Sequence, residues 1–217
     1  MRYFLLLCFI SLSLYSEAQI SNKEIDAVLM PYVTSGEVSG IVTIVAKGEN
    51  ILSVNNVGFQ NIDKNKKMEP DALFWIASQS KPIAATAVMM LVEEGKLSLD
   101  EPITTYIPEF NRLVVARIWR EGWQVEERLS KPITLRHLLS HTSGMQWVAE
   151  LQGQAKKIDV LPLQLSLYAS TTTPLFFEPG ERYNYSNQGI NVAAAIIERV
   201  SGKPYFDFLQ SRLFEPL

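Results

Sequence analysis

The fold of this chain is decided by the stretch Phe74-Trp75-Ile76-Ala77-Ser78-Gln79-Ser80-Lys81-Pro82. A helix tolerates proline only in its first turn, so Pro82 predicts a helix that begins close to Ser78. Residues 83–92 contain no charged residue, glycine or proline, and Gly95 predicts the end of the helix after Glu94. Because this segment is apolar all round, we expect it to be buried in the centre of the molecule.

Ser78 is a candidate nucleophile because Lys81 lies three residues further along the same helix face, with about 5 to 6 Å between Cβ atoms. A serine hydroxyl needs a base, and desolvation at the positive end of a helix lowers the pKa of a lysine. The N–H groups of the helix start also stabilise an oxyanion. The alternative is a serine N-cap followed by a solvated lysine.

A second candidate group is Tyr185-Ser186-Asn187, at the start of a predicted apolar helix over residues 188–200. The Tyr185 phenol is a potential proton acceptor, and the Asn187 amide is a potential orienting group. The alternative is a core tyrosine followed by an asparagine cap. His141 follows a short helix that Thr134 caps, and we expect a turn held by hydrogen bonds there rather than a catalytic base.

The composition is that of a soluble globular protein, with 47% hydrophobic residues and a net charge of −3. The 20 basic and 23 acidic residues are interspersed, so no nucleic-acid partner is expected. The only histidines are His137 and His141, and the only cysteine, Cys8, lies in the apolar run near the N-terminus, so no set of three soft metal ligands is expected. We therefore expect neither a metal nor a cofactor.

Residues 1–18 have the pattern of a secretory signal: Arg2, an apolar run, and Ser16-Glu17-Ala18 as a cleavage site. Cleavage between Ala18 and Gln19 would place residues 19–217, as one domain, in the periplasm or outside the cell. The apolar run is too short for a stable membrane span, although an uncleaved anchor is the alternative. The mature chain would have no cysteine and no disulfide.

Local patterns predict the remaining elements. The sequence Ser21-Asn22-Lys23-Glu24 is a capping box for a helix over residues 24–33. The other predictions are hairpins over 41–46 with 51–58 and over 113–119 with 123–129, a loop over 61–71, and helices over 158–170 and 205–213.

The sequence resembles the serine β-lactamase and penicillin-binding-protein superfamily, within it the branch of class C β-lactamases and esterases. Ser-x-x-Lys is the first motif of that superfamily, and Tyr-x-Asn is the second motif of the class C branch. The resemblance covers about residues 24–217 and continues through the segments Met90–Leu97, Leu99–Pro102, Tyr106–Phe110, Ile133–Gly144, Phe177–Gly180 and Val200–Gly202.

The resemblance implies an α/β (α+β) fold of β-lactamase/transpeptidase type, with a sheet flanked by helices and a mostly helical lobe. It also implies an acyl-enzyme mechanism on amide or ester substrates. Ser78 would attack the carbonyl, Lys81 and Tyr185 would share the proton transfers, and Asn187 would position Lys81 and a substrate amide.

The third motif of the family, Lys-x-Gly or His-x-Gly on a sheet strand, does not occur in these 217 residues. We therefore expect a truncated chain with an incomplete sheet, because an isolated hairpin is only marginally stable. The rival function is a binding remnant that holds peptidoglycan-like ligands without turnover. The residues do not distinguish a β-lactam, a D-amino-acid peptide or a simple ester as substrate, and they do not indicate an oligomeric state.

Overall fold

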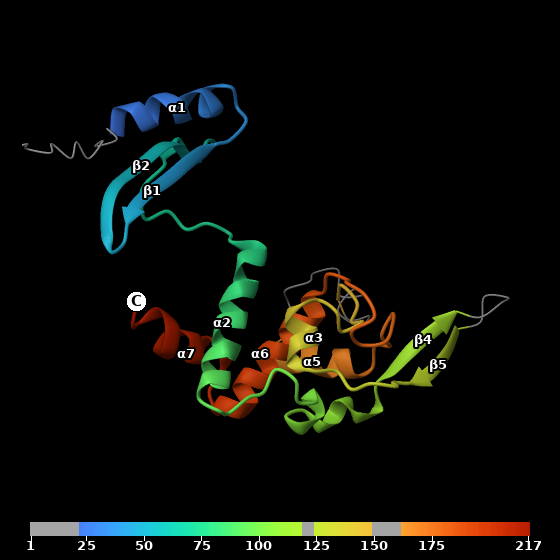
Figure 1. Cartoon of the computed structure of the whole chain (residues 1–217). Helices are drawn as coiled ribbons and strands as arrows, with labels where there is room; N and C mark the ends of the chain where they lie inside the picture. Colours follow the sequence, from blue (N-terminus) through green and yellow to red (C-terminus); the bar gives the residue numbers. More distant parts are fainter. Residues whose placement is uncertain (1–21, 119–123, 149–161) are drawn as a thin grey trace, which may run out of the picture. The chain divides into compact units, whose positions relative to one another are not determined.

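The computed structural model describes residues 22–118, 124–148 and 162–217 (Figure 1). They form two compact units, one ending at Trp75 and the other beginning at Ile76. The predicted signal sequence lies outside the described residues. Both units combine the helices and antiparallel strands that the α+β expectation requires.

The N-terminal unit contains helix α1 (Asn22–Thr34) and an antiparallel sheet in the order β1-β2-β3. Strands β1 (Gly40–Lys47) and β2 (Asn50–Asn61) form the predicted hairpin. The prediction of a plain loop over residues 61–71 is wrong, because β3 (Lys66–Lys67) pairs with Phe59 and Asn61. Two consecutive lysines do not show the β-branched, alternating pattern that predicts a strand, and only the pairing with β2 defines them as one.

A buried amide attaches α1 to the sheet. The side chain of Asn55, on β2, donates to the carbonyl oxygen of Asn22 at 2.9 Å and to Oδ1 of Asp26 at 3.0 Å. These bonds satisfy a polar group that would otherwise be costly to bury. The capping box proposed for this helix includes Ser21, which lies outside the described residues.

The C-terminal unit holds the main hydrophobic core, and helix α6 (Asn187–Ser201) lies at its centre. It contacts α2 (Ser80–Glu93), α3 (Leu135–Leu139), α5 (Leu163–Thr171) and α7 (Tyr205–Leu209). Figure 1 shows α6 lying against α2 and α3. The largest fully buried side chains of the unit come from several elements and include Leu91, Leu138, Ile196 and Phe208.

The expectation that α2 is buried on every side is wrong for the described residues. Its buried positions are Ala84, Ala87, Val88 and Leu91, which lie on one face, whereas Met89 is 45% exposed. An apolar segment that lacks charges does not by itself indicate how many faces are covered. The helix with the most buried positions in this unit is α6.

The predicted second hairpin is confirmed as β4 (Val114–Ile118) and β5 (Gln124–Arg128), although its turn lies outside the described residues. Helix α5 begins at Leu163, just after Pro162, later than the predicted residue 158, and 158–161 are not described. The last predicted helix is α7 followed by a π-helical turn, Gln210–Phe214. Gly202, at φ 68°, ends α6 as expected.

Candidate active site

The start of α2 places Ser78 in a tight turn. A 3₁₀ helix, Ala77–Gln79, leads directly into α2, and the hydroxyl of Ser80 donates to the carbonyl oxygen of Ala77 at 2.8 Å. No side-chain hydrogen bond caps α2, so the alternative of a serine N-cap at Ser78 is wrong. The Ser78 hydroxyl is left exposed and available for another role.

Two side chains meet the Ser78 hydroxyl. The ammonium group of Lys81 lies 3.0 Å from Ser78 Oγ, and the Tyr185 hydroxyl donates to the same oxygen at 2.7 Å. Lys81 Nζ also lies 4.8 Å from the centroid of the Tyr185 ring. Hydrogen bonding to Lys81, and then to Ser78, lowers the pKa of the Tyr185 phenol below its ordinary value. A lowered pKa raises the fraction of Tyr185 that is present as phenolate, the form that can accept a proton.

The turn that carries Tyr185 is held by its neighbours. Ser186 is the N-cap of α6: its Oγ accepts from the N–H of Gly189 at 3.0 Å and donates to the carbonyl oxygen of Gln146 at 2.6 Å. The Asn184 amide donates to the carbonyl oxygen of Met145 at 3.1 Å. The alternative of a core tyrosine with an asparagine cap is therefore wrong, because Ser186 provides the cap and Tyr185 is only half-buried.

Asn187 is the first residue of α6, and its backbone N–H donates to the carbonyl oxygen of Trp147 at 3.0 Å. Within the described residues its side chain makes no hydrogen bond to Lys81 or Ser78. The structure thus brings Ser78, Lys81 and Tyr185 into contact with one another, and Asn187 follows Tyr185 by two residues at the start of α6. The predicted positioning role of the Asn187 amide stays a prediction.

His141 lies in a turn held by hydrogen bonds, as expected, but its ring also stacks on Tyr185, a contact that no local pattern indicated. The ring centroids are 4.5 Å apart and the ring planes differ by 30°. Trp147 packs against the same tyrosine with centroids 5.3 Å apart. These contacts join segments that are far apart in the chain, so no local pattern could predict them.

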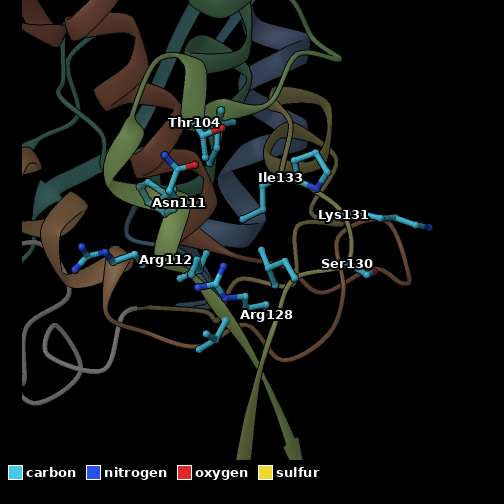
Figure 2. A pocket seen from close by; sticks show the side chains of 13 residues that line it. Thr104, Asn111, Arg112, Arg128, Ser130, Lys131 and Ile133 are labelled. Carbon is cyan, nitrogen blue, oxygen red and sulfur yellow. The ribbon is translucent and has the colours of Figure 1, made fainter.

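A pocket of about 720 Å³ lies elsewhere in the C-terminal unit (Figure 2). Its lining includes Thr104, Asn111, Arg128 and Ile133, and none of the three residues that meet at Ser78. Figure 2 shows Arg112 and Lys131 extending to opposite sides rather than toward a common point. This pocket is therefore not part of the candidate active site.

Among residues 22–118, 124–148 and 162–217, no three His, Cys, Asp or Glu side chains are grouped to hold a metal ion. In that same part of the chain, no helix is long and apolar enough to cross a membrane.

The chain is similar to known hydrolases in sequence and in fold. Esterase EstB of Burkholderia gladioli is 33% identical over 204 residues, which are 89% of this chain and 49% of that protein. The structure of EstCE1, a hydrolase with promiscuous acyltransferase activity, matches with a TM-score of 0.75 and 26% identity, over 92% of this chain and 52% of that one.

The D-amino acid amidase from Ochrobactrum anthropi SV3 matches with a TM-score of 0.68 and 30% identity, over 90% of this chain and 49% of that one. The chain spans about half the length of each of these three proteins. The model of the Beta-lactamase family matches residues 25–217. The chain therefore belongs to the Beta-lactamase family and has the fold of the serine β-lactamases and penicillin-binding proteins.

Proposed function

We propose that this chain carries the nucleophile and the proton-transfer groups of a serine hydrolase that forms an acyl-enzyme with amide or ester substrates. The observation that supports this most is the meeting of Lys81 Nζ and the Tyr185 hydroxyl at one exposed serine oxygen. An ordinary surface serine has no need of two such partners. The family relationship to an esterase and an amidase supports the same reaction class.

In the first step, Ser78 Oγ attacks the carbonyl carbon of the substrate while its proton passes to the base, which is either the Tyr185 phenolate or the neutral amine of Lys81. The new C–O bond leaves a negative charge on the former carbonyl oxygen, and the N–H groups at the start of α2 face such a charge favourably. The tetrahedral intermediate then collapses. The alcohol or amine departs with the proton that the serine lost, and an acyl group remains on Ser78.

In the second step, water attacks the acyl carbon and gives its proton to the same base. Ser78 then recovers its hydroxyl proton, and the carboxylic acid leaves. Tyr185 is the stronger candidate for the base, because the pKa of its phenol is lowered by the two residues that it contacts. Lys81 then acts as the positive charge that stabilises the phenolate.

Covalent labelling tests the proposal. An activated fluorophosphonate should add to Ser78 of the wild-type protein, and intact-mass analysis should show no adduct on Ser78→Ala. Ser80→Ala is the matched control, since Ser80 is an exposed serine in the same turn and should leave labelling intact. Labelling that survives in Ser78→Ala would refute the assignment.

The competing function, binding without turnover, predicts a different time course. An ester substrate would then give one equivalent of product or none, and a fluorescent penicillin would stay attached. The chain should be measured both as 217 residues and with any coding sequence that follows Leu217, because the resemblance places a second oxyanion donor in a motif absent here. Losing one such donor costs about 10² to 10³ in rate.

We also propose that export removes residues 1–18. Sequencing the N-terminus of the protein recovered from the periplasm or the medium should begin at Gln19. An intact Met1 in a membrane fraction would favour the uncleaved anchor.

A further inference from the structure

His141 has a backbone conformation that few residues adopt. Its φ is 58°, and the other non-glycine residues with positive φ in the described part of the chain are Asn65 and Ala77. Left-handed backbone is disfavoured for side chains that carry a Cβ, and such sites persist only where surrounding contacts stabilise them. The contacts of His141 are therefore informative.

Three contacts connect His141 to the turn around Tyr185. Its carbonyl oxygen accepts from the N–H of Asn184 at 2.8 Å, and its Nδ1 accepts from the N–H of Ser186 at 3.2 Å. Its ring stacks on the Tyr185 ring. One residue thus holds the backbone on both sides of the tyrosine and one face of the ring between them.

The hydrogen bond to Nδ1 defines the state of the imidazole. A ring nitrogen that accepts from a backbone N–H carries no proton, so the proton of the neutral ring is on Nε2. Burial, and then the charge of Lys81, lower the pKa of His141. The described groups that face the ring are Lys81 and the phenols of Tyr183 and Tyr185. No carboxylate is among them, so the ring stays neutral near pH 7.

We propose that His141 is a positioning residue that holds the Tyr185 hydroxyl on Ser78. It is not a catalytic residue, because within the described residues it makes no contact with the Ser78 hydroxyl. The stacking fixes the tilt of the phenol ring, and the two backbone bonds fix the path of the chain through residues 184–186. The kinetic part of this inference rests on the proposed function, whereas the structural part does not.

Two substitutions separate the contributions of His141. His141→Asn keeps a side chain that tolerates positive φ and carries an oxygen acceptor, but it removes the stacked ring. His141→Phe keeps a ring and removes the acceptor. His137→Asn is the matched control: His137 is the other histidine, and its Nδ1 accepts from the N–H of Thr134 at 3.2 Å, away from Tyr185. Thermal melting should establish that each variant is folded.

The readout is the Tyr185 phenol itself. Protein labelled with ¹³C at tyrosine Cζ should show a Tyr185 resonance, identified by its absence from Tyr185→Phe. In His141→Asn and His141→Phe this resonance should move, and its titration should shift toward the ordinary tyrosine value of 10.0. The rate of acylation at saturating reagent should fall about 10- to 100-fold with KM little changed, since a misplacement of about 1 Å can cost 10²-fold.

The results distinguish the two proposals. An unchanged Tyr185 resonance and titration in both His141 variants would overturn the positioning role whether or not the protein is active. An equal change in His137→Asn would also overturn it, because the effect would then be a general loss of packing. A wild-type protein that never reacts, but whose Tyr185 signal depends on His141, would refute the proposed function alone.

Discussion

The two sides of the candidate site are built in different ways. Ser78 lies at the start of a helix, and its turn is held by backbone geometry and by one hydroxyl, that of Ser80. Tyr185 lies in an irregular turn, and a side chain and carbonyl groups from the distant segment 141–146 hold the residues on either side of it. The serine is therefore positioned by local structure, and the tyrosine by long-range contacts.

Burial follows the same division. Ser78 is exposed, and its helix packs through Ala84, Val88 and Leu91 further along. On the other side, Ser186 is only 1% exposed, and its hydroxyl is bonded to Gln146 and Gly189. Substitutions near Ser78 should thus change stability little, whereas substitutions of the residues that hold the turn of Tyr185 should lower it.

The largest expected effect comes from the two groups that contact the nucleophile. Tyr185→Phe and Lys81→Ala should each lower the rate of acylation about 10² to 10⁴-fold, as expected for groups that transfer the proton. Phenylalanine keeps the ring that stacks on His141, so Tyr185→Phe should keep its melting temperature. Stopped-flow ester hydrolysis measures the rate. A change confined to KM would argue that the residue is structural.

A smaller effect separates the two turns directly. Ser186→Ala removes an N-cap and a hydrogen bond to Gln146, and it should cost about 1 to 2 kcal/mol in the free energy of unfolding. Ser80→Ala, on the other side, removes one exposed bond and should cost less than about 1 kcal/mol. Urea unfolding measures both. Equal costs would contradict the division between local and long-range positioning.

Acid should lower the stability of the protein through its two histidines. Burial lowers the pKa of both His137 and His141 in the folded protein, from an ordinary value of 6.5. The unfolded chain then binds protons at higher pH than the folded chain. The contribution of the two neutral histidines to the free energy of unfolding is therefore complete above pH 6.5, and it is lost as the pH falls toward their pKa values in the folded protein. Urea midpoints across a pH series that brackets 6.5 should fall on the acid side, and less steeply in a variant carrying His137→Asn and His141→Asn.

The smallest expected effect tests whether a contact at the far end of α6 influences Tyr185 at its start. Arg199, near the end of α6, binds both carboxylate oxygens of Glu109 at 2.8 and 3.0 Å, and both side chains are partly exposed. Glu109→Gln should cost at most about 1 kcal/mol and leave hydrolysis unchanged. A marked loss of rate would show that Tyr185 is sensitive to contacts at the far end of its helix.

The sequence was most informative where local rules apply. Pro82 located the start of α2, Gly95 and Gly202 located helix ends, and Thr134 was identified as a cap. The Ser78–Lys81 contact followed from helical spacing alone. These features depend on residues within one or two helical turns of each other in the chain, so the order of the residues is enough to predict them.

The features that the sequence missed depend on tertiary packing. Nothing near His141 in the chain indicates that its ring meets Tyr185, and nothing near Lys66 indicates that it pairs with Asn61 in a strand. The central position of α6 rather than α2 was missed for the same reason, since both segments are apolar and only their neighbours decide which faces are covered. The prediction that Tyr185 and Ser78 belong to one site came from the resemblance to a family and not from their spacing in the chain.

The hydrogen bond between Tyr185 and Ser78 joins residues 107 positions apart in the chain. Closing so long a segment costs more chain entropy than pairing Lys47 with Asn50 across a hairpin turn. During refolding from denaturant, hairpins and helices should therefore form before the serine meets its tyrosine. Reactivity toward a fluorophosphonate would then recover after the far-ultraviolet circular dichroism signal, which makes the nucleophile a reporter of the last stage of folding.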